Sequence, residues 1–82
     1  LGIAAVSMSI FARWNRDHFR VSIRSKRGRS ANALAREFFH GGGHEMAAGG
    51  KVFVPADVPS QAGAAAHIAA CVAQFLQKED DR

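Results

Sequence analysis

Three consecutive glycines stand directly before a histidine in residues 40–50, which read HGGGHEMAAGG. Glycine costs roughly 0.5–1 kcal/mol relative to alanine inside a regular element, so this run indicates a sharp turn or the close approach of another group to the backbone. Free amides at the start of a helical turn can bind an anion, and an adjacent imidazole can donate one more hydrogen bond. We therefore interpret Gly41, Gly42, Gly43 and His44 as a phosphate cradle. The alternative is a plain turn with a surface histidine.

A second set of candidate residues lies in the segment SIRSK, residues 22–26. The planar guanidinium of Arg24 can bind a phosphate through two hydrogen bonds or stack on a base, whereas Lys26 offers only a point charge. The alternative for Arg24 is an exposed strand arginine in a cross-strand salt bridge. Spacing alone leaves both interpretations open.

Residues for catalysis or metal binding form no known pattern in this chain. The four histidines have no metal-ligand spacing, and Asp17 and Asp57 each lack a paired carboxylate. His67 and Cys71 fall within one alanine-rich segment, which favours structural roles for both. We therefore predict no catalytic residue, no metal ligand and no cofactor within this chain.

The SIRSK segment lies on the second strand of a predicted β-hairpin. Residues 18–26 alternate between apolar and polar side chains, so one face of this strand is apolar and the other carries Ser22 and Arg24. The apolar run at residues 3–12 predicts the first strand, and turn-forming residues within 13–17 join the two.

The glycine loop follows a predicted amphipathic helix over residues 31–39, where apolar residues recur at i, i+3, i+4 and i+7. Ser30 fits the N-cap of this helix, and Gly41 stands where a C-cap glycine would.

After the glycines, residues 44–48 favour a short helical turn, residues 51–54 a strand and residues 61–77 a second helix, followed by an acidic tail at 78–82. The order is β-β-α-loop-β-α. It predicts an α/β (α+β) fold, with a small mixed β-sheet and helices packed against it.

Composition predicts one folded domain over residues 1–82, because 48% of the residues are hydrophobic and 22% are charged. The chain begins with Leu1, so we expect a fragment of a larger protein.

Residues 1–51 carry nine Lys and Arg against three acidic residues, and residues 52–82 carry two against four, which favours an anionic partner. A single cysteine and no apolar run near 20 residues predict a cytoplasmic protein without membrane association.

The segments SIRSK, NALAREF and GGGHEMAAGG together resemble the C-terminal DHH-associated domain of the DHH phosphoesterases. The resemblance implies the substrate-binding lobe of a two-domain phosphodiesterase or phosphatase. A separate N-terminal DHH domain would hold two Mn²⁺ ions, and none of that domain is present here. The glycine–histidine loop of the family closes over the substrate phosphate, and the strand arginine, matching Arg24, also binds substrate. Ser22 and Ser25 belong to the same motif.

Within the family, the triple glycine with SIRSK looks most like the branch of nano-RNases (oligoribonucleases) and 3′-phosphoadenosine 5′-phosphate phosphatases. RecJ exonucleases are similar through GHEMAAG, and cyclic-di-AMP phosphodiesterases share the Gly-Gly-Gly-His loop. The implied partners are a nucleotide or short single-stranded nucleic acid, the missing DHH domain and, for the full protein, a second copy in a homodimer. The fragment alone is expected to hydrolyse nothing.

A stand-alone RNA-binding module with a basic hairpin is the other interpretation. Its binding would depend on many Lys and Arg residues and on salt, and hardly on His44.

Overall fold

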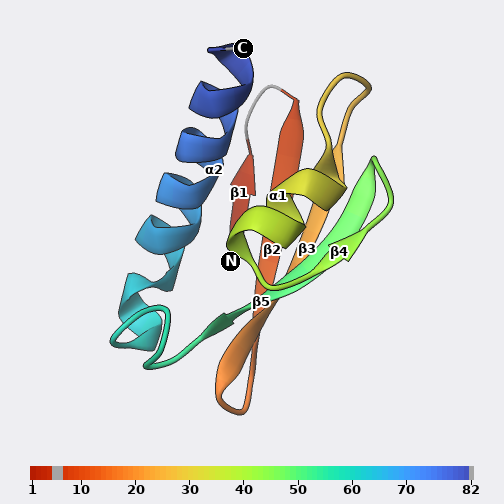
Figure 1. Ribbon diagram of the computed structural model, residues 1–82. Coiled ribbons are helices and arrows are strands. Elements are labelled where there is room, and N and C mark those ends of the chain that lie inside the picture. The colour runs from red at the N-terminus through yellow and green to blue at the C-terminus, as the bar shows by residue number, and fades with distance from the viewer. Residues whose placement is uncertain (5–6, 82) are drawn as a thin grey trace.

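The computed structural model describes residues 1–4 and 7–81, and within this part the chain forms one five-stranded sheet and two α-helices (Figure 1). The strands are β1 (Gly2–Ala4), β2 (Met8–Asn15), β3 (His18–Ser25), β4 (Gly42–Gly43) and β5 (Ala47–Phe53). The helices are α1 (Ala31–Phe38) and α2 (Ala64–Asp80), with a 3-10 turn at Gln61–Gly63 before α2. The order across the sheet is β1-β2-β3-β5-β4. The predicted α/β class, with helices packed against a sheet, is confirmed.

The β2–β3 hairpin forms the centre of the sheet and pairs over eight residues, from Met8 opposite Ser25 to Asn15 opposite His18. The alternation predicted for β3 is confirmed. Ile23 is fully buried opposite the buried Ile10, while the intervening side chains of β3 are exposed. Because strand side chains alternate between faces, this register sets one apolar and one polar face of the sheet.

Both helices pack on the apolar face. The Ser30 hydroxyl accepts a hydrogen bond from the Ala33 N–H at 3.0 Å and so caps α1, as predicted. Leu34 of α1 and Ile68 of α2 are fully buried in the same apolar cluster as the inward side chains of the strands. Burying each such side chain stabilises the fold by about 1.5–3 kcal/mol. The opposite face of the sheet is left without a helix over it (Figure 1).

The single strand predicted at residues 3–12 is wrong, because β1 turns back and pairs antiparallel with β2, with Ile3 opposite Ile10. Residues 5–6 of that prediction lie outside the described residues. The sequence between the two strands has no glycine, proline, asparagine or aspartate to signal a turn. The apolar run therefore contains most of the short β1 and the first part of the longer β2.

The helical turn predicted at residues 44–48 is also wrong. His44 and Ala47 exchange backbone hydrogen bonds in both directions, at 2.7 and 3.3 Å, and so close a hairpin turn between β4 and β5. The strand predicted from Lys51 is the second half of the longer β5.

The sheet, expected to be mixed, has only antiparallel pairings among the described strands. The α1 connection runs from β3 to β4, which point in the same direction. β5 lies between them and pairs antiparallel with both.

The expected acidic tail is largely the last turn of α2, which continues to Asp80. Arg29 donates to Asp80 at 2.9 Å, and Lys78 pairs with Glu37 of α1. These contacts tie the end of α2 to α1 and to the loop before it.

Candidate functional site

Close packing explains why the glycine loop needs glycine. A Cβ added at Gly41 would lie 1.9 Å from the Gly49 carbonyl oxygen, and one added at Gly43 would lie 2.8 Å from the Ala47 carbonyl oxygen. The backbone of the loop therefore lies directly against β5. The predicted C-cap role of Gly41 is wrong, because His40 takes the left-handed conformation after α1, with φ of 57°.

Most of the loop amides are already used within the protein. The Gly41 N–H donates to Ala35 at 3.1 Å, and the Gly43 N–H donates to the Asn32 side-chain oxygen at 3.0 Å. The His44 N–H donates to Ala47 in the hairpin turn. The loop therefore does not present the helical array of free amides that the sequence suggested. Its glycines allow a tight hairpin that carries the histidine.

Ser25 connects the two sequence motifs. Its hydroxyl lies 2.8 Å from the Arg29 carbonyl oxygen and 3.1 Å from that of Glu45, and its N–H donates to Met46 at 3.0 Å. The Ala31 N–H also donates to the Glu45 carbonyl, at 2.7 Å. The last serine of SIRSK thus fastens the turn that bears His44 to the end of β3.

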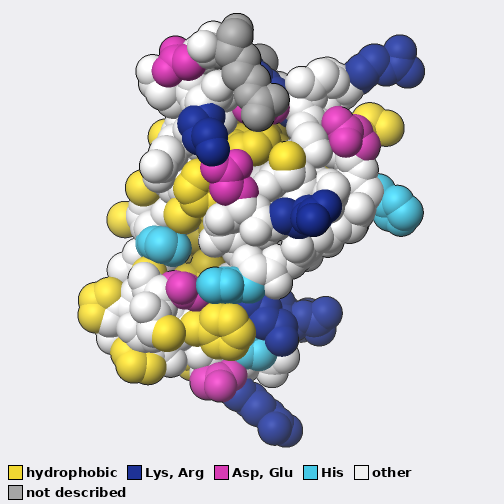
Figure 2. All heavy atoms as spheres, in the orientation of Figure 1, with side chains coloured by type: hydrophobic (Ala, Val, Ile, Leu, Met, Phe, Trp, Pro, Cys, Tyr) yellow, Lys and Arg dark blue, Asp and Glu magenta, His cyan; other side chains and the backbone are white. Residues whose placement is uncertain are grey.

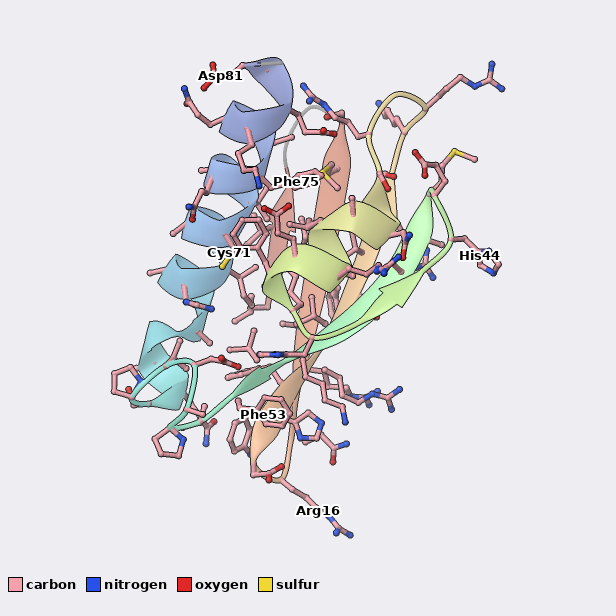
Figure 3. All side chains as sticks on the ribbon, in the orientation of Figure 1. Arg16, His44, Phe53, Cys71, Phe75 and Asp81 are labelled. Atoms are coloured by element: carbon pink, nitrogen blue, oxygen red, sulfur yellow. The ribbon has the colours of Figure 1, made fainter. Side chains whose placement is uncertain are left out.

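Arg24 and His44 lie in one row across the sheet. Arg24 is opposite Ala47, and Ala47 is the hydrogen-bonded partner of His44. Two strand spacings of about 4.8 Å separate Arg24 from His44, and directly paired residues point to the same face. Both side chains are exposed, and His44 projects into solvent at the turn (Figure 3). The structure thereby brings the two main candidates to one end of the helix-free face.

Arg24 has no carboxylate partner in the described part of the chain. Its guanidinium donates to the neighbouring Ile23 carbonyl at 3.1 Å. The cross-strand salt bridge considered for Arg24 is therefore not formed among these residues. A guanidinium without a carboxylate partner can bind an incoming anion.

Ser22 lies in the next row along the same face, between Phe11 of β2 and Gly49 of β5. A hollow of ≈ 660 Å³ opens here, and its lining includes Ser22, Gly41 and Gly42 but not Arg24 or His44. Ser22 and Arg24 line a second hollow together, beside Phe11. Ser22 therefore belongs to both hollows, whereas His44 stands at the end of the sheet and lines neither.

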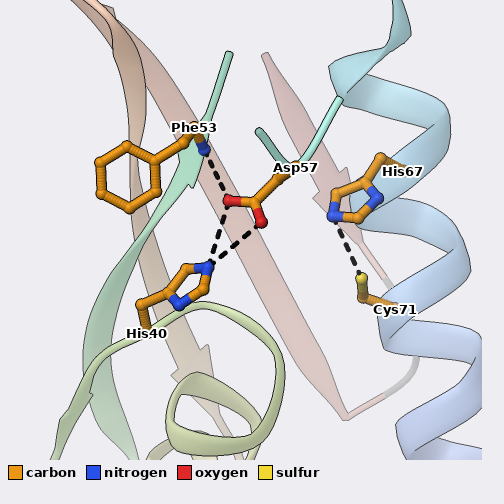
Figure 4. Close-up of polar contacts among 5 residues, drawn as sticks. All are labelled: His40, Phe53, Asp57, His67 and Cys71. Carbon is orange, nitrogen blue, oxygen red and sulfur yellow. Dashed lines mark hydrogen bonds and ion pairs between the residues drawn. The ribbon is translucent and has the colours of Figure 1, made fainter. Parts of the chain in front are cut away.

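A histidine–aspartate pair that the sequence analysis missed supports the loop from the other end. His40 Nε2 lies 3.1 and 3.2 Å from the two Asp57 carboxylate oxygens, and the Phe53 N–H donates to the same carboxylate at 2.8 Å (Figure 4). Burial raises the pKa of Asp57, but the hydrogen bonds from Phe53 and His40 outweigh it and hold the pKa below the usual value. No local spacing signals this pair, because its members are 17 residues apart.

His67 and Cys71 face each other across one turn of α2, with 3.6 Å between Nε2 and Sγ (Figure 4). The thiol is buried, and this burial raises its pKa, so the reactive thiolate is disfavoured. The structural role predicted for Cys71 agrees with this position.

The described residues contain no group of three or more His, Cys, Asp or Glu side chains that could hold a metal ion. Likewise, no helix in this part of the chain is long and apolar enough to cross a membrane.

A small antiparallel sheet that carries helices on one face, and exposed basic and glycine residues on the other, defines the described part of the chain as an α/β domain. Residues 1–78 match the model of the DHHA1 domain, and the chain belongs to this family. DHHA1 is the domain associated with DHH phosphoesterases. None of the curated proteins compared with the sequence matches it.

Proposed function

We propose that this chain is the substrate-binding lobe of a DHH phosphoesterase and binds the phosphate of a nucleotide or short oligonucleotide. The observation that carries the proposal is the row formed by Arg24, Ala47 and His44 on the helix-free face. A guanidinium fork and an imidazole on either side of a small residue can both donate hydrogen bonds to one phosphate. The hairpin turn held by Ser25 keeps the imidazole in this row.

The described residues do not fit a metal centre, so this proposal assigns Mn²⁺ to a separate DHH domain. Metal ions there would supply an activated water for attack on phosphorus. The role of this chain is then to bind the substrate phosphate and fix its orientation. The same proposal includes a cytoplasmic location, dimerisation of the full protein and a place in the nano-RNase and 3′-phosphoadenosine 5′-phosphate phosphatase branch.

An NMR titration with 3′-phosphoadenosine 5′-phosphate and with a short oligoribonucleotide tests the proposal. Arg24→Ala and His44→Ala should each weaken both ligands by about tenfold, the effect of losing one or two charge-assisted hydrogen bonds. Arg16→Asn is the matched control. It removes one positive charge at the far tip of the hairpin, where φ is 66° and asparagine is tolerated. Binding that is unchanged in both test variants would rule out this site.

The exposed Lys and Arg side chains also support the second candidate function, a general RNA-binding module. Lys and Arg side chains gather beside the lower half of the sheet, away from α2 (Figure 2). Such a module would bind RNA with an affinity that falls with salt and does not change in His44→Ala.

A further inference from the structure

Three cations lie directly opposite one another in a single row of the sheet. Arg13 of β2 is opposite Arg20 of β3, and Arg20 is opposite Lys51 of β5. All three side chains are exposed on the face that has no helix. We call these residues the cation row. Like charges directly opposite each other destabilise a sheet, so the row is unfavourable for folding alone.

Within the described residues, Asp17 offsets this repulsion only weakly, because its attraction to Lys51 is the smallest of the causes that lower the Asp17 pKa. None of the three cations forms an ion pair with a described Asp or Glu. Asp17, at the nearby hairpin turn, is instead paired with His18 at 2.8 Å. The cation row therefore has the charge complementary to a polyanion, and an arrangement that opposes stability is expected where a surface serves binding.

An exposed aromatic side chain lies between the cation row and the Arg24 row. Phe11 is 63% exposed, with Gly2 opposite it on one side and Ser22 on the other. Neither neighbour is large enough to cover the ring. Phe11 and all three cations line the first hollow described above. Exposed aromatic rings within a basic groove are the platforms on which bases of single-stranded nucleic acids stack.

The spacing of the rows sets the length of the ligand. Arg20 and Arg24 are four residues apart on β3, which corresponds to about 13 Å along the strand. At about 3.4 Å per stacked nucleotide, this distance covers roughly four nucleotides. A mononucleotide held at Arg24 does not extend that far.

We propose that the cation row and Phe11 form an extended subsite for a single-stranded oligonucleotide whose terminal phosphate is held at Arg24 and His44. This inference rests on the proposed function, because Arg24 and His44 supply the anchored end. It assigns the chain to oligonucleotide substrates rather than to nucleotide phosphates alone. The cations, which lie side by side across three strands, contact phosphates at the far end of the oligonucleotide, and Phe11 stacks on a base between the cation row and Arg24.

The test compares two ligands, a five-nucleotide oligoriboadenylate and 3′-phosphoadenosine 5′-phosphate, by isothermal titration calorimetry at several salt concentrations. The test variant carries Arg13→Gln, Arg20→Gln and Lys51→Gln. The matched control loses three scattered exposed cations through Arg16→Asn, Arg27→Gln and Lys78→Gln. We expect the test variant to bind the pentanucleotide at least tenfold more weakly, with mononucleotide binding within twofold. Its salt slope should fall by about 2, since each single-strand phosphate contact contributes about 0.7.

Phe11→Thr is a second variant that keeps a strand-forming residue and removes the ring. It should weaken the pentanucleotide by about tenfold through lost stacking and leave the mononucleotide unchanged. Thermal unfolding of every variant verifies the fold, and the cation-row variant should be at least as stable as the parent because repulsion is removed.

The outcomes separate this inference from the proposed function. If Arg24→Ala weakens both ligands while the cation-row variant affects them equally, or affects neither, the subsite is wrong and the substrate lobe stands. Equal losses in the cation-row variant and its control would also overturn the subsite. If Arg24→Ala and His44→Ala change nothing, both proposals fail.

Discussion

The two serines of the SIRSK motif differ in what their hydroxyls contact, although they are three residues apart. Ser25 lies within hydrogen-bond distance of two loop carbonyls, whereas Ser22 makes no side-chain hydrogen bond among the described residues and lies on the exposed face. The sequence located both serines but did not distinguish them, because the partners of Ser25 belong to segments that only the fold brings close.

Ser25→Ala should lower the free energy of unfolding by about 1 kcal/mol, because the Arg29 and Glu45 carbonyls lose a donor. Urea unfolding followed by circular dichroism measures this change. Ser22→Ala is the matched control and should stay within about 0.5 kcal/mol of the parent, as for an exposed surface position. Equal effects of the two substitutions would contradict the fastening role of Ser25.

Gly41→Ala should be far more disruptive, because the added Cβ would collide with the β5 backbone at Gly49. We expect a loss of about 3 kcal/mol or more, as for other substitutions that overpack a rigid site. Gly63→Ala is the control, since an added Cβ there meets nothing within 4 Å and its φ is −84°. Differential scanning calorimetry should therefore give a much lower melting temperature for Gly41→Ala and an unchanged or slightly higher one for Gly63→Ala.

The elements that the sequence predicted well are those with a strong local pattern. β3 and α1 were located because alternation and helical periodicity depend on neighbouring residues in the chain. The β4–β5 hairpin was missed because its glycines have no side chains to show a period, and because the turn is stabilised by Ser25 and Ala31 from distant segments. Residues 44–48 resembled a helical turn only while these partners were unknown.

The His40–Asp57 pair links the end of α1 to the loop after β5 and makes this corner sensitive to acid. The pKa of Asp57 is lowered in the folded protein, so its stabilising contribution is fully present above the unfolded value of 3.8 and is lost as pH falls through the folded value. The melting temperature of the parent should therefore fall more steeply below about pH 4 than that of Asp57→Asn. Parallel pH profiles would show that Asp57 does not contribute in this way.

At the scale of the whole molecule, the two faces of the sheet differ in the residues that they carry. The helices and the apolar cluster occupy one face, and the candidate ligand-binding residues occupy the other. Composition indicated the excess of positive charge in residues 1–51 but not the cation row, because register across three strands places those residues together. The anionic partner therefore stays a prediction from composition, and the cation row could be located only from the fold.

The isolated chain should bind oligonucleotides yet release no product when Mn²⁺ is added, because the described residues form no metal centre. Thin-layer separation of a labelled pentanucleotide after long incubation measures this directly. A trace nuclease contaminant is distinguished by Arg24→Ala, which would leave its activity unchanged. Manganese-dependent turnover that is lost in Arg24→Ala would place catalysis within this chain.

The outer strands of the sheet have a further consequence for how copies of this domain behave at high concentration. β1 spans three residues and β4 only two, so both edges offer very few unpaired backbone groups. The Gly43 N–H at one edge is also occupied by the Asn32 side chain. Long, open edges recruit strands from other molecules and start fibrils, and short or covered edges prevent this. Copies of this domain can thus stay separate in solution, although one face of the sheet has no helix over it and is open to a ligand.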